Sequence, residues 1–557
     1  MRRHTIKWWN LIWLGVALVG CRPTVGPALR LPSLPTWTPP PAGAPTMVTV
    51  GVLTPISPPS RPTPTAAPSS AWQVAVAPEI PAALAEQVWQ IVARTPGFTP
   101  HTDPAAPPDL TIGLTDGAPV ATWIYAVVGP FPTLEDDVAL AALQARWQSA
   151  DGPALALEAT TAALLTRLWG SPPGAAVIVL PAEQLAQRLW QRDGAWAIVP
   201  FEQLQPAWKV LAVAGMSPLA ADFTPEAYPL VWHLRASGEP AALAAWPAGL
   251  SNRDPAKLTR LAMTGVTALV RATAFAMEQN GVLYPGEEVA GVLRSADIAH
   301  ISNEVAFAPD CPYPNPIGGT TFCSDDRYFE LLQSVGADVI ELTGNHVNDW
   351  GSENLGHTLD LYDAAGMQHF GGGRNAADAQ RAAQFEHHGN RIALVGCNPV
   401  GPVYAWATAD APGSRPCDGS LAGQIAQLSA ENWLVFATLQ YDEFYFYAPT
   451  AQQQADFRAL IDAGATAVSG SQGHHAQGFE LYGNGFIHYG LGNLFFDQMD
   501  QLGTRQSFVD TYIIYDGRLI SVTLFTGLIE NYARPRVMTP DERREALTSV
   551  FDAGVWP

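Results

Sequence analysis

The sequence predicts an α/β fold, in which short apolar strands alternate with helices. Residues 76–250 contain the β-rich runs DLTIGL, AAVIVLPAE and AWAIVPF, with the helical segment EQLAQRLWQRD between two of them. Residues 259–530 repeat one pattern, an apolar strand that runs into polar residues, as in ADVIELTGNH, RIALVGCNP and WLVFATLQY. Alternation of this kind is typical of parallel strands joined by helical crossovers.

The composition bounds the size of the molecule and excludes one class of partner. The chain has 557 residues, enough for about two to four domains, and its 48% of hydrophobic residues supply a core. The 30 Lys and Arg against 51 Asp and Glu give a net charge of −21. Because so acidic a surface repels phosphate backbones, we expect no nucleic-acid partner.

Residues 1–21 predict a secretion signal. A basic segment with Arg2, Arg3 and Lys7 precedes the apolar stretch WWNLIWLGVALVG, which is shorter than the ~20 residues that a spanning helix needs. The stretch ends in LVGC at Cys21, which resembles the bacterial lipobox and implies that Cys21 is lipidated. We therefore expect an extracytoplasmic protein held to the cell membrane by its N-terminal lipid. The alternative is an ordinary signal peptide or an uncleaved anchor.

A tether and a first folded part follow the signal. Residues 22–75 are rich in Pro, Thr, Ala and Ser, a composition that favours an extended, disordered spacer. Residues 76–250 are predicted to form a smaller α/β domain that ends at the boundary SNRDPAKL (251–258). The run AWAIVPFEQLQPAWKVLAV loosely resembles the second lobe of type 2 solute-binding domains. A small α/β domain without a ligand of its own is the alternative.

The four remaining cysteines predict two disulfides. An even number of cysteines in an oxidising compartment favours bridges, and four cysteines allow three pairings. We favour Cys311–Cys323 and Cys397–Cys417, because each pair brackets a loop rich in Pro or Gly. A zinc cluster is the sharper alternative, but the sequence has no C-x-x-C spacing.

The second folded part, residues 259–530, gathers polar residues at predicted strand ends. In α/β folds the carboxyl ends of strands assemble binding sites. We therefore expect one cleft that contains the following side chains: Glu304, Asn345, His346, Gln440, Asp442, Glu443, Gln472, His474 and His475. Residues 531–557 are predicted to be a loop and a closing helix that starts at Thr539-Pro540.

Several spaced motifs over residues 259–500 resemble one family. LTGNHVNDWG, AGMQHFGGGRN, LIDAGA and VSGSQGHHAQGFELYGNGFIHYGLGNLFFD occur in the order found in CapA-type capsule (poly-γ-glutamate) synthesis proteins. That resemblance implies membership of the calcineurin-like metallophosphatase superfamily, with a four-layer fold: a β-sandwich flanked by helices. It also implies two metal ions held by Asp, Asn and His, and a His beside the Asn as general acid.

The resemblance assigns roles to matching residues. It makes Asn345 a metal ligand, His346 the catalytic acid and Asp349 the anchor of that histidine. Glu304 takes the place of the acidic bridging ligand, and Arg271 keeps its family spacing, so it is a candidate for substrate contact. Asp442 and Glu443 follow a strand end, where they are further candidates for anchoring or substrate contact.

This sequence departs from the family pattern at several ligands. Val266 stands where the family has Asp, and Ser302 where it has Asn unless Asn303 has shifted to replace it. Gln440 and Gln472 replace two histidines, and His474 is the surviving histidine of the closing motif. An amide oxygen binds a metal more weakly than an imidazole nitrogen does.

Three metal states therefore stay open. They are a two-metal site, a single hard-ion site and no metal at all. The candidate ligands are Glu304, Asn345 and His474, with Gln440 and Gln472 as weaker ones, and the cofactor is a divalent ion such as Mn, Mg or Fe. His475 is expected to point away from the site, because adjacent residues of an extended segment face opposite sides.

Three functions stay open as well. The first is a membrane-anchored CapA-like protein that helps make, export or attach an anionic surface polymer such as poly-γ-glutamate and acts as a metal-dependent hydrolase. The second is a pseudoenzyme that binds polymer or a partner from the synthesis machinery. The third is a solute-binding lipoprotein that acts through residues 76–250. With a net charge of −21, binding of an acidic polymer must depend on local bases such as Arg271 and Arg374.

Overall fold

The computed structural model describes residues 71–557 except 79, 81, 115, 150, 152, 173–176, 192–193 and 248–249. The predicted signal, Cys21 and the tether up to residue 70 lie outside the described residues. The described residues form one compact unit. Within the described part, no helix is long and apolar enough to cross a membrane.

Eleven described strands form the first sheet, in the order β2-β1-β3-β10-β4-β8-β6-β7, with β9 and β11 on β4 and β5 on β9. They are β1 (Trp72–Val76), β2 (Phe98–Pro100), β3 (Leu110–Gly113), β4 (Ala118–Pro130), β5 (Asp137–Val138), β6 (Leu155–Leu157), β7 (Val177–Val179), β8 (Trp196–Pro200), β9 (Trp208–Val213), β10 (Val231–Gly238) and β11 (Leu250–Ser251). The helices are α1 (Ala82–Arg94), α2 (Leu140–Gln148), α3 (Ala159–Trp169), α4 (Ala182–Leu189) and α5 (Pro240–Ala245).

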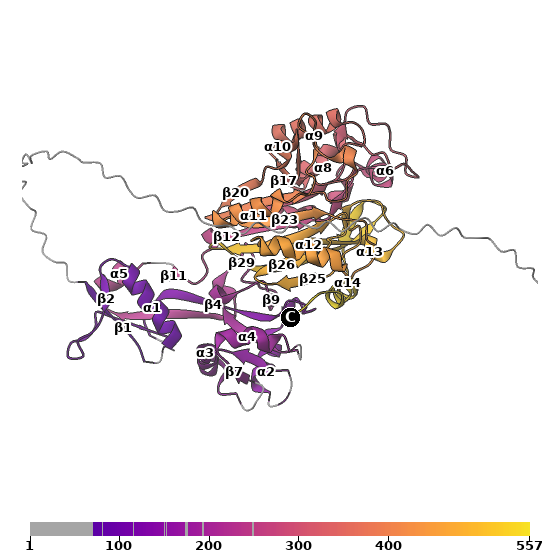
Figure 1. The fold of residues 1–557 in the computed structure, drawn as a ribbon. Coiled ribbons are helices and arrows are strands. Elements are labelled where there is room, and N and C mark those ends of the chain that lie inside the picture. The colour runs from indigo at the N-terminus through magenta and orange to yellow at the C-terminus, as the bar shows by residue number, and fades with distance from the viewer. Residues whose placement is uncertain are drawn as a thin grey trace, which may run out of the picture. The chain divides into compact units, whose positions relative to one another are not determined.

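This sheet runs through two lobes. The first lobe holds β1–β3 with α1 and α5, and the second holds β6–β8 with α2–α4; the long strand β4 runs between them (Figure 1). β10 pairs antiparallel with both β3 and β4. The parallel pairs β1–β3 and β6–β8 agree with the predicted crossovers.

Two further sheets follow. The nine-stranded sheet contains β12 (Leu258–Thr264), β13 (Val266–Thr267), β14 (Ile298–Asn303), β17 (Val339–Glu341), β18 (Gln368–Phe370), β27 (Asn493–Phe495), β28 (Gln506–Tyr515), β29 (Arg518–Glu530) and β30 (Arg534–Val537). The six-stranded sheet contains β20 (Ala383–His387), β21 (Asn390–Cys397), β23 (Leu434–Gln440), β24 (Ala467–Ser471), β25 (Phe479–Tyr482) and β26 (Gly485–His488). Two short ladders pair β15 (Phe307–Ala308) with β16 (Ser324–Asp325) and β19 (Gly372–Gly373) with β22 (Gly413–Ser414).

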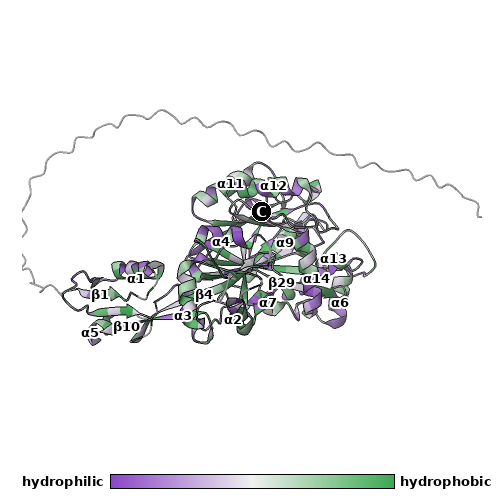
Figure 2. Cartoon of the chain, turned by 90° about the horizontal axis from the view of Figure 1, so that it is seen from below, coloured by the Kyte–Doolittle hydropathy of each residue, from purple (hydrophilic) through white to green (hydrophobic). Residues whose placement is uncertain are grey.

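The helices of this part are α6 (Arg271–Asn280), α7 (Ala290–Arg294), α8 (Phe329–Ser334), α9 (Ser352–Ala365), α10 (Ala376–Ala379), α11 (Ser420–Ala430), α12 (Ala451–Asp462), α13 (Leu502–Arg505) and α14 (Pro540–Asp552). The last begins at the predicted cap, where Thr539 and Glu542 form a capping box. In Figure 2, α11 and α12 carry both hydrophobic and hydrophilic residues, as expected of helices that cover one face of a sheet.

Three apolar cores stack the two sheets and their helices into four layers. One core joins α6–α9 to the nine-stranded sheet, and another joins α11 and α12 to the six-stranded sheet. Between the sheets, Phe436 and Tyr512 pack with ring centroids 5.0 Å apart. Full burial of such a side chain contributes about 1.5–3 kcal/mol, so this middle core holds the sheets face to face.

The eleven-stranded part packs directly on the four-layer part. Phe131, at the end of β4, lies 5.4 Å from the ring of Phe479 and 5.0 Å from that of Phe486. Arg543 of α14 donates to Asp136 at 2.6 and 2.8 Å. These contacts explain why the described residues form one unit.

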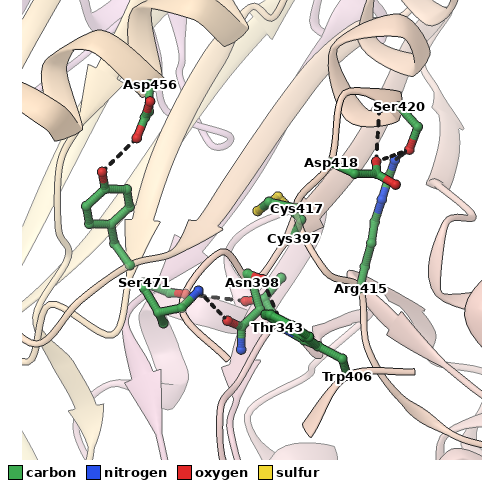
Figure 3. The surroundings of a disulfide bond; sticks show 12 residues. Thr343, Cys397, Asn398, Trp406, Arg415, Cys417, Asp418, Ser420, Asp456 and Ser471 are labelled. Carbon is green, nitrogen blue, oxygen red and sulfur yellow. Dashed lines mark hydrogen bonds between the residues drawn. A yellow bond between two sulfur atoms is a disulfide. The ribbon is translucent and has the colours of Figure 1, made fainter. Parts of the chain in front are cut away.

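Both preferred disulfides are present. Cys311 pairs with Cys323, and Cys397 pairs with Cys417. Figure 3 shows the second bridge at the end of β21, where Arg415 donates to Ser420 at 2.9 Å. The first bridge closes a loop that borders the candidate site.

Candidate functional site

The candidate site lies where two sheets present their strand ends to each other. Glu304 follows β14, and Glu341 ends β17 of the same sheet. From the other sheet, Gln440 ends β23 and Gln472 follows β24. These strands are parallel within each sheet, so their polar ends gather at one edge.

The amide of Gln440 is the centre of a buried polar cluster. Its nitrogen lies 3.1 Å from Glu304 Oε1 and 3.3 Å from Asn345 Oδ1, and it also contacts Gln472 Oε1. Its oxygen accepts a 2.7 Å hydrogen bond from the Ser471 hydroxyl. Sequence reasoning placed the four predicted residues in one cleft, and the structure brings them together.

Glu304 is a carboxylate with little compensation for its burial. It is 1% exposed, and burial raises its pKa above the usual value, although His474, His346 and the Gln440 hydrogen bond act in the opposite direction. Glu304 therefore favours its protonated form more than an exposed glutamate does.

A second buried carboxylate, Glu341, lies behind this cluster and was missed from the sequence. It accepts from Ser471 Oγ at 3.1 Å and faces His300 Nε2 at 3.2 Å, and Thr343 also donates to it. Burial alone would raise its pKa, but the His300 hydrogen bond and charge and the Thr343 hydroxyl lower it overall. The signal was present in ADVIELTGNH, where one acidic residue interrupts an apolar strand.

His346 and Asp349 form the dyad that the family motif implies. His346 Nδ1 lies 2.7 Å from Asp349 Oδ2, and that carboxylate also accepts from the Phe322 amide and the Tyr404 hydroxyl, each at 3.0 Å. The ring of Phe322 packs on His346 with centroids 4.4 Å apart. The Cys311–Cys323 loop thus helps to orient the histidine, a role that the sequence did not reveal.

The two consecutive histidines face different surroundings. His474 Nδ1 lies 2.8 Å from Asn493 Oδ1, and its Nε2 lies 4.0 Å from Glu443 Oε1. His475 instead contacts the backbone oxygen of Ala476 at 2.8 Å and packs against Tyr447. His475 therefore points away from Glu304, in agreement with the expected alternation.

Other predicted residues lie at the rim or outside the cluster. Glu443 accepts from Gln472 Nε2 at 3.4 Å, whereas Asp442 is exposed and forms no hydrogen bond to the cluster among the described residues. Arg271 pairs with Asp497 through its Nε at 3.0 Å. Arg374 pairs with Asp360 and Asp363 of α9 at 2.8 and 2.6 Å, which ties it to that helix.

Val266 and Asn303 lie where the sequence departs from the family motif, and both make structural contacts. Val266 lies in an apolar cluster with Val270, Val305 and Phe496. Asn303 donates to the Val305 carbonyl and the Tyr362 hydroxyl, both at 2.8 Å. The Asn303 side chain therefore binds these groups, and among the described residues no hydrogen bond joins that side chain to the Glu304 or Gln440 side chain.

A comparison with known proteins identifies a family that matches the part of the chain with this site. Residues 260–498 match the family described as bacterial capsule synthesis protein PGA_cap. These residues belong to the PGA_cap family.

Relatives and solved structures extend the comparison of the PGA_cap part. The capsule biosynthesis protein CapA of Bacillus anthracis is 24% identical over 304 residues, which cover 53% of this chain and 74% of the relative. The PGA biosynthesis protein CapA of Bacillus subtilis is 26% identical over 171 residues, 30% of this chain and 45% of the relative. A 5'-nucleotidase precursor from Thermus thermophilus superposes with a TM-score of 0.31 and 12% identity, over 53% of this chain and 58% of that one.

The donor set of the PGA_cap part does not suit a metal ion as it stands. The oxygens of Glu304, Asn345 and Gln472 converge on the Gln440 nitrogen, a donor that occupies the place a cation would need. Among the described residues, no group of three or more His, Cys, Asp or Glu side chains is placed to hold a metal. The predicted ligands therefore stay predictions.

An open pocket borders the His346–Asp349 dyad. It holds about 130 Å³ and is lined by the Cys311–Cys323 loop together with Arg271, Phe322 and Trp350. The Arg271 guanidinium lies 5.0 Å from the Phe322 ring, and Phe322 in turn packs on His346. The pocket thus places one guanidinium and several aromatic rings beside the His346–Asp349 dyad.

Proposed function

We propose that this protein is a capsule-synthesis accessory protein that binds an anionic surface polymer, such as poly-γ-glutamate, in the pocket at Arg271. The observation that carries the proposal is the contrast between the two neighbouring regions. The Glu304–Gln440 cluster is buried, whereas the pocket beside the His346–Asp349 dyad is open and holds a guanidinium.

The chemistry of the pocket suits a chain of carboxylates and amides. Arg271 offers a planar guanidinium that can bind carboxylate, although Asp497 already occupies part of it. Tyr313, which is 61% exposed, and Trp350 supply flat apolar surfaces at the same rim. The names of the Bacillus relatives, which mention capsule and PGA biosynthesis, agree with such a polymer.

Polymer binding tests this proposal directly. Full-length protein is titrated with poly-γ-glutamate, alongside Arg271→Gln and the matched control Arg374→Gln, whose guanidinium is tied to α9. We expect Arg271→Gln to weaken binding by about tenfold or more, or ~1.4 kcal/mol, and Arg374→Gln to bind like the wild type. No binding by the wild type, or equal binding by both variants, would overturn the proposal.

Elemental mass spectrometry separates this function from hydrolysis. We expect wild-type protein, expressed with added Mn, Fe or Mg, to carry no stoichiometric metal. Metal that is present in the wild type and lost in the Glu304→Ala, His474→Ala double variant would favour a metal-dependent hydrolase, with His346 as its general acid. A phosphoester and γ-glutamyl substrate screen would then follow.

The four layers of the PGA_cap part support our proposal that this part has a calcineurin-like β-sandwich fold. We further propose that Cys21 is lipidated and anchors the chain to the outer face of the membrane. Metabolic labelling with a palmitate analogue tests this, since Cys21→Ser should abolish incorporation and release the protein.

A second candidate function is solute binding by the eleven-stranded part. The observation that favours it is a cavity between its two lobes, lined from both α1 and the start of α3. Two lobes joined by strands β4 and β10 suit a ligand that both lobes contact.

A further inference from the structure

The cavity between the two lobes is small and mixed in character. It holds about 30 Å³, and its lining comes from α1, β4, the start of α3 and the segment after β8. The lining residues are Leu84, Gln87, Trp123, Tyr125, Glu158, Thr160, Thr161, Pro200 and Gln203. A volume of this size admits one small polar group, since a water needs roughly 10–15 Å³ by the same kind of measure.

Two carboxylates give the cavity a negative character. Glu158 accepts from Gln203 Nε2 at 3.1 Å on both of its oxygens. Glu202, beside the cavity, accepts from Gln87 Nε2 at 2.6 Å and from Trp123 Nε1 at 3.3 Å. None of the described lining residues is Lys, Arg or His, so an anionic ligand would find no compensating charge.

One buried polar atom in the lining lacks a partner. The Gln87 side-chain oxygen is buried and has no hydrogen-bond partner among the described residues. The Tyr125 side chain, which also lines the cavity, is 4% exposed. Burial, Glu202 and Glu158 all raise the pKa of Tyr125, so its phenol stays neutral beside the carboxylates. An unpartnered acceptor in a cavity that also contains a carboxylate points to a missing donor group.

We infer that this cavity binds the ammonium group of a small ligand. An ammonium donates three hydrogen bonds, which match the Gln87 oxygen, the Tyr125 hydroxyl and the Glu158 carboxylate. Its positive charge offsets the carboxylates, and the neighbouring Trp123 adds an aromatic surface that favours cations. The inference rests on the second candidate function and names its ligand class; it is independent of polymer binding at Arg271.

Calorimetry with defined probes tests the inference on the full-length protein. The probes are ammonium, methylammonium and 1,4-diaminobutane as chlorides, with sodium phosphate, sodium acetate and calcium chloride as competing classes. Glu158→Gln and Tyr125→Phe change the cavity, and Glu183→Gln is the matched control because Glu183 lies exposed on α4. Thermal melts of each variant establish that it is folded.

We expect at least one amine to bind the wild type, and Glu158→Gln and Tyr125→Phe each to weaken that binding about tenfold, or ~1.4 kcal/mol. Glu183→Gln should bind like the wild type. Binding of phosphate, acetate or calcium in place of amines would leave solute binding standing and overturn the ammonium assignment. Amine binding that is equal in all folded variants would overturn the inference. Binding of no probe would also overturn it, and would overturn the proposal that this part binds small ions or amines.

Discussion

Glu304 and Glu341 end neighbouring parallel strands, and both are almost fully buried, yet their pKa values move in opposite directions. Glu341 faces His300 and accepts from the hydroxyls of Thr343 and Ser471. Glu304 accepts from one amide, that of Gln440. Glu341 therefore has several hydrogen-bond partners behind the site, whereas Glu304, at the centre of the site, has one donor to offset its burial.

Burial alone therefore does not decide whether the pKa of a carboxylate rises or falls. What decides it is the number and charge of the donors that replace water. In the PGA_cap part the amide of Gln440 stands where the family resemblance implies a histidine beside a cation. The amide satisfies Glu304 only weakly, and it leaves the surrounding oxygens to share one nitrogen.

The matched pair Glu341→Gln and Glu304→Gln gives the largest expected difference. Glu341→Gln should lower the free energy of unfolding by about 3 kcal/mol, because it removes the charged acceptor of the Thr343 and Ser471 hydroxyls, and hydrogen bonds to a charged group contribute about 1.5–3 kcal/mol each. Glu304→Gln should change it by less than about 1 kcal/mol, since an amide oxygen still accepts from Gln440. Urea unfolding at neutral pH, with chelator present, measures both. An equal loss in the two variants would contradict the comparison.

Gln440→Glu should have the next largest effect. It places a second carboxylate against Glu304 and removes the donor that three oxygens share. In chelator we expect a loss of about 2–3 kcal/mol, because buried acceptors are left unsatisfied. Added Mg²⁺ or Mn²⁺ should restore much of it, since the oxygens would then surround a cation. The matched control is Gln424→Glu on α11, outside the cluster, where metal should change nothing.

The sequence predicted which residues gather at this site better than it predicted the contacts between them. Strand ends gathered Glu304, Asn345, Gln440 and Gln472 as expected, because parallel strands of one sheet finish at the same edge. The motif also implied the His346–Asp349 pair. Local spacing carries such information, and it carried the opposite orientation of His475 as well.

Long-range contacts were not predictable in the same way. His300 and Glu341 meet across two strands, and Phe322 reaches His346 only because its loop folds back over the site. Asp442 was grouped with the site by its place after a strand, but it turns outward, whereas Glu443 turns in. Arg374 follows a turn near the site, yet its guanidinium forms ion pairs with two aspartates of α9.

The two carboxylates should also respond oppositely to pH. A raised native pKa means that Glu304 contributes stability below its unfolded value of 4.5 and loses it as pH rises through the native value. A lowered native pKa means that Glu341 contributes stability above 4.5 and loses it as pH falls through the native value.

Unfolding curves of the two variants at several pH values test this sign. The stability of Glu304→Gln relative to the wild type should increase from acid to neutral pH. The stability of Glu341→Gln relative to the wild type should decrease over the same interval. Parallel pH profiles for the two variants would show that the donors around them do not set their titration.

The smallest effect is expected at the rim, where Asp442→Asn is compared with Glu443→Gln. Asp442 is exposed and has no contact with Glu304 or Gln440 among the described residues, so its change should stay within about 0.5 kcal/mol. Glu443 accepts from Gln472 and from Tyr445, the latter at 2.8 Å, but its side chain is 47% exposed, so its loss should not exceed about 1 kcal/mol. Thermal unfolding of both variants measures the difference. A larger loss of unfolding free energy in Asp442→Asn than in Glu443→Gln would contradict this expectation. It would mean that the polar cluster extends beyond Glu443 and includes Asp442.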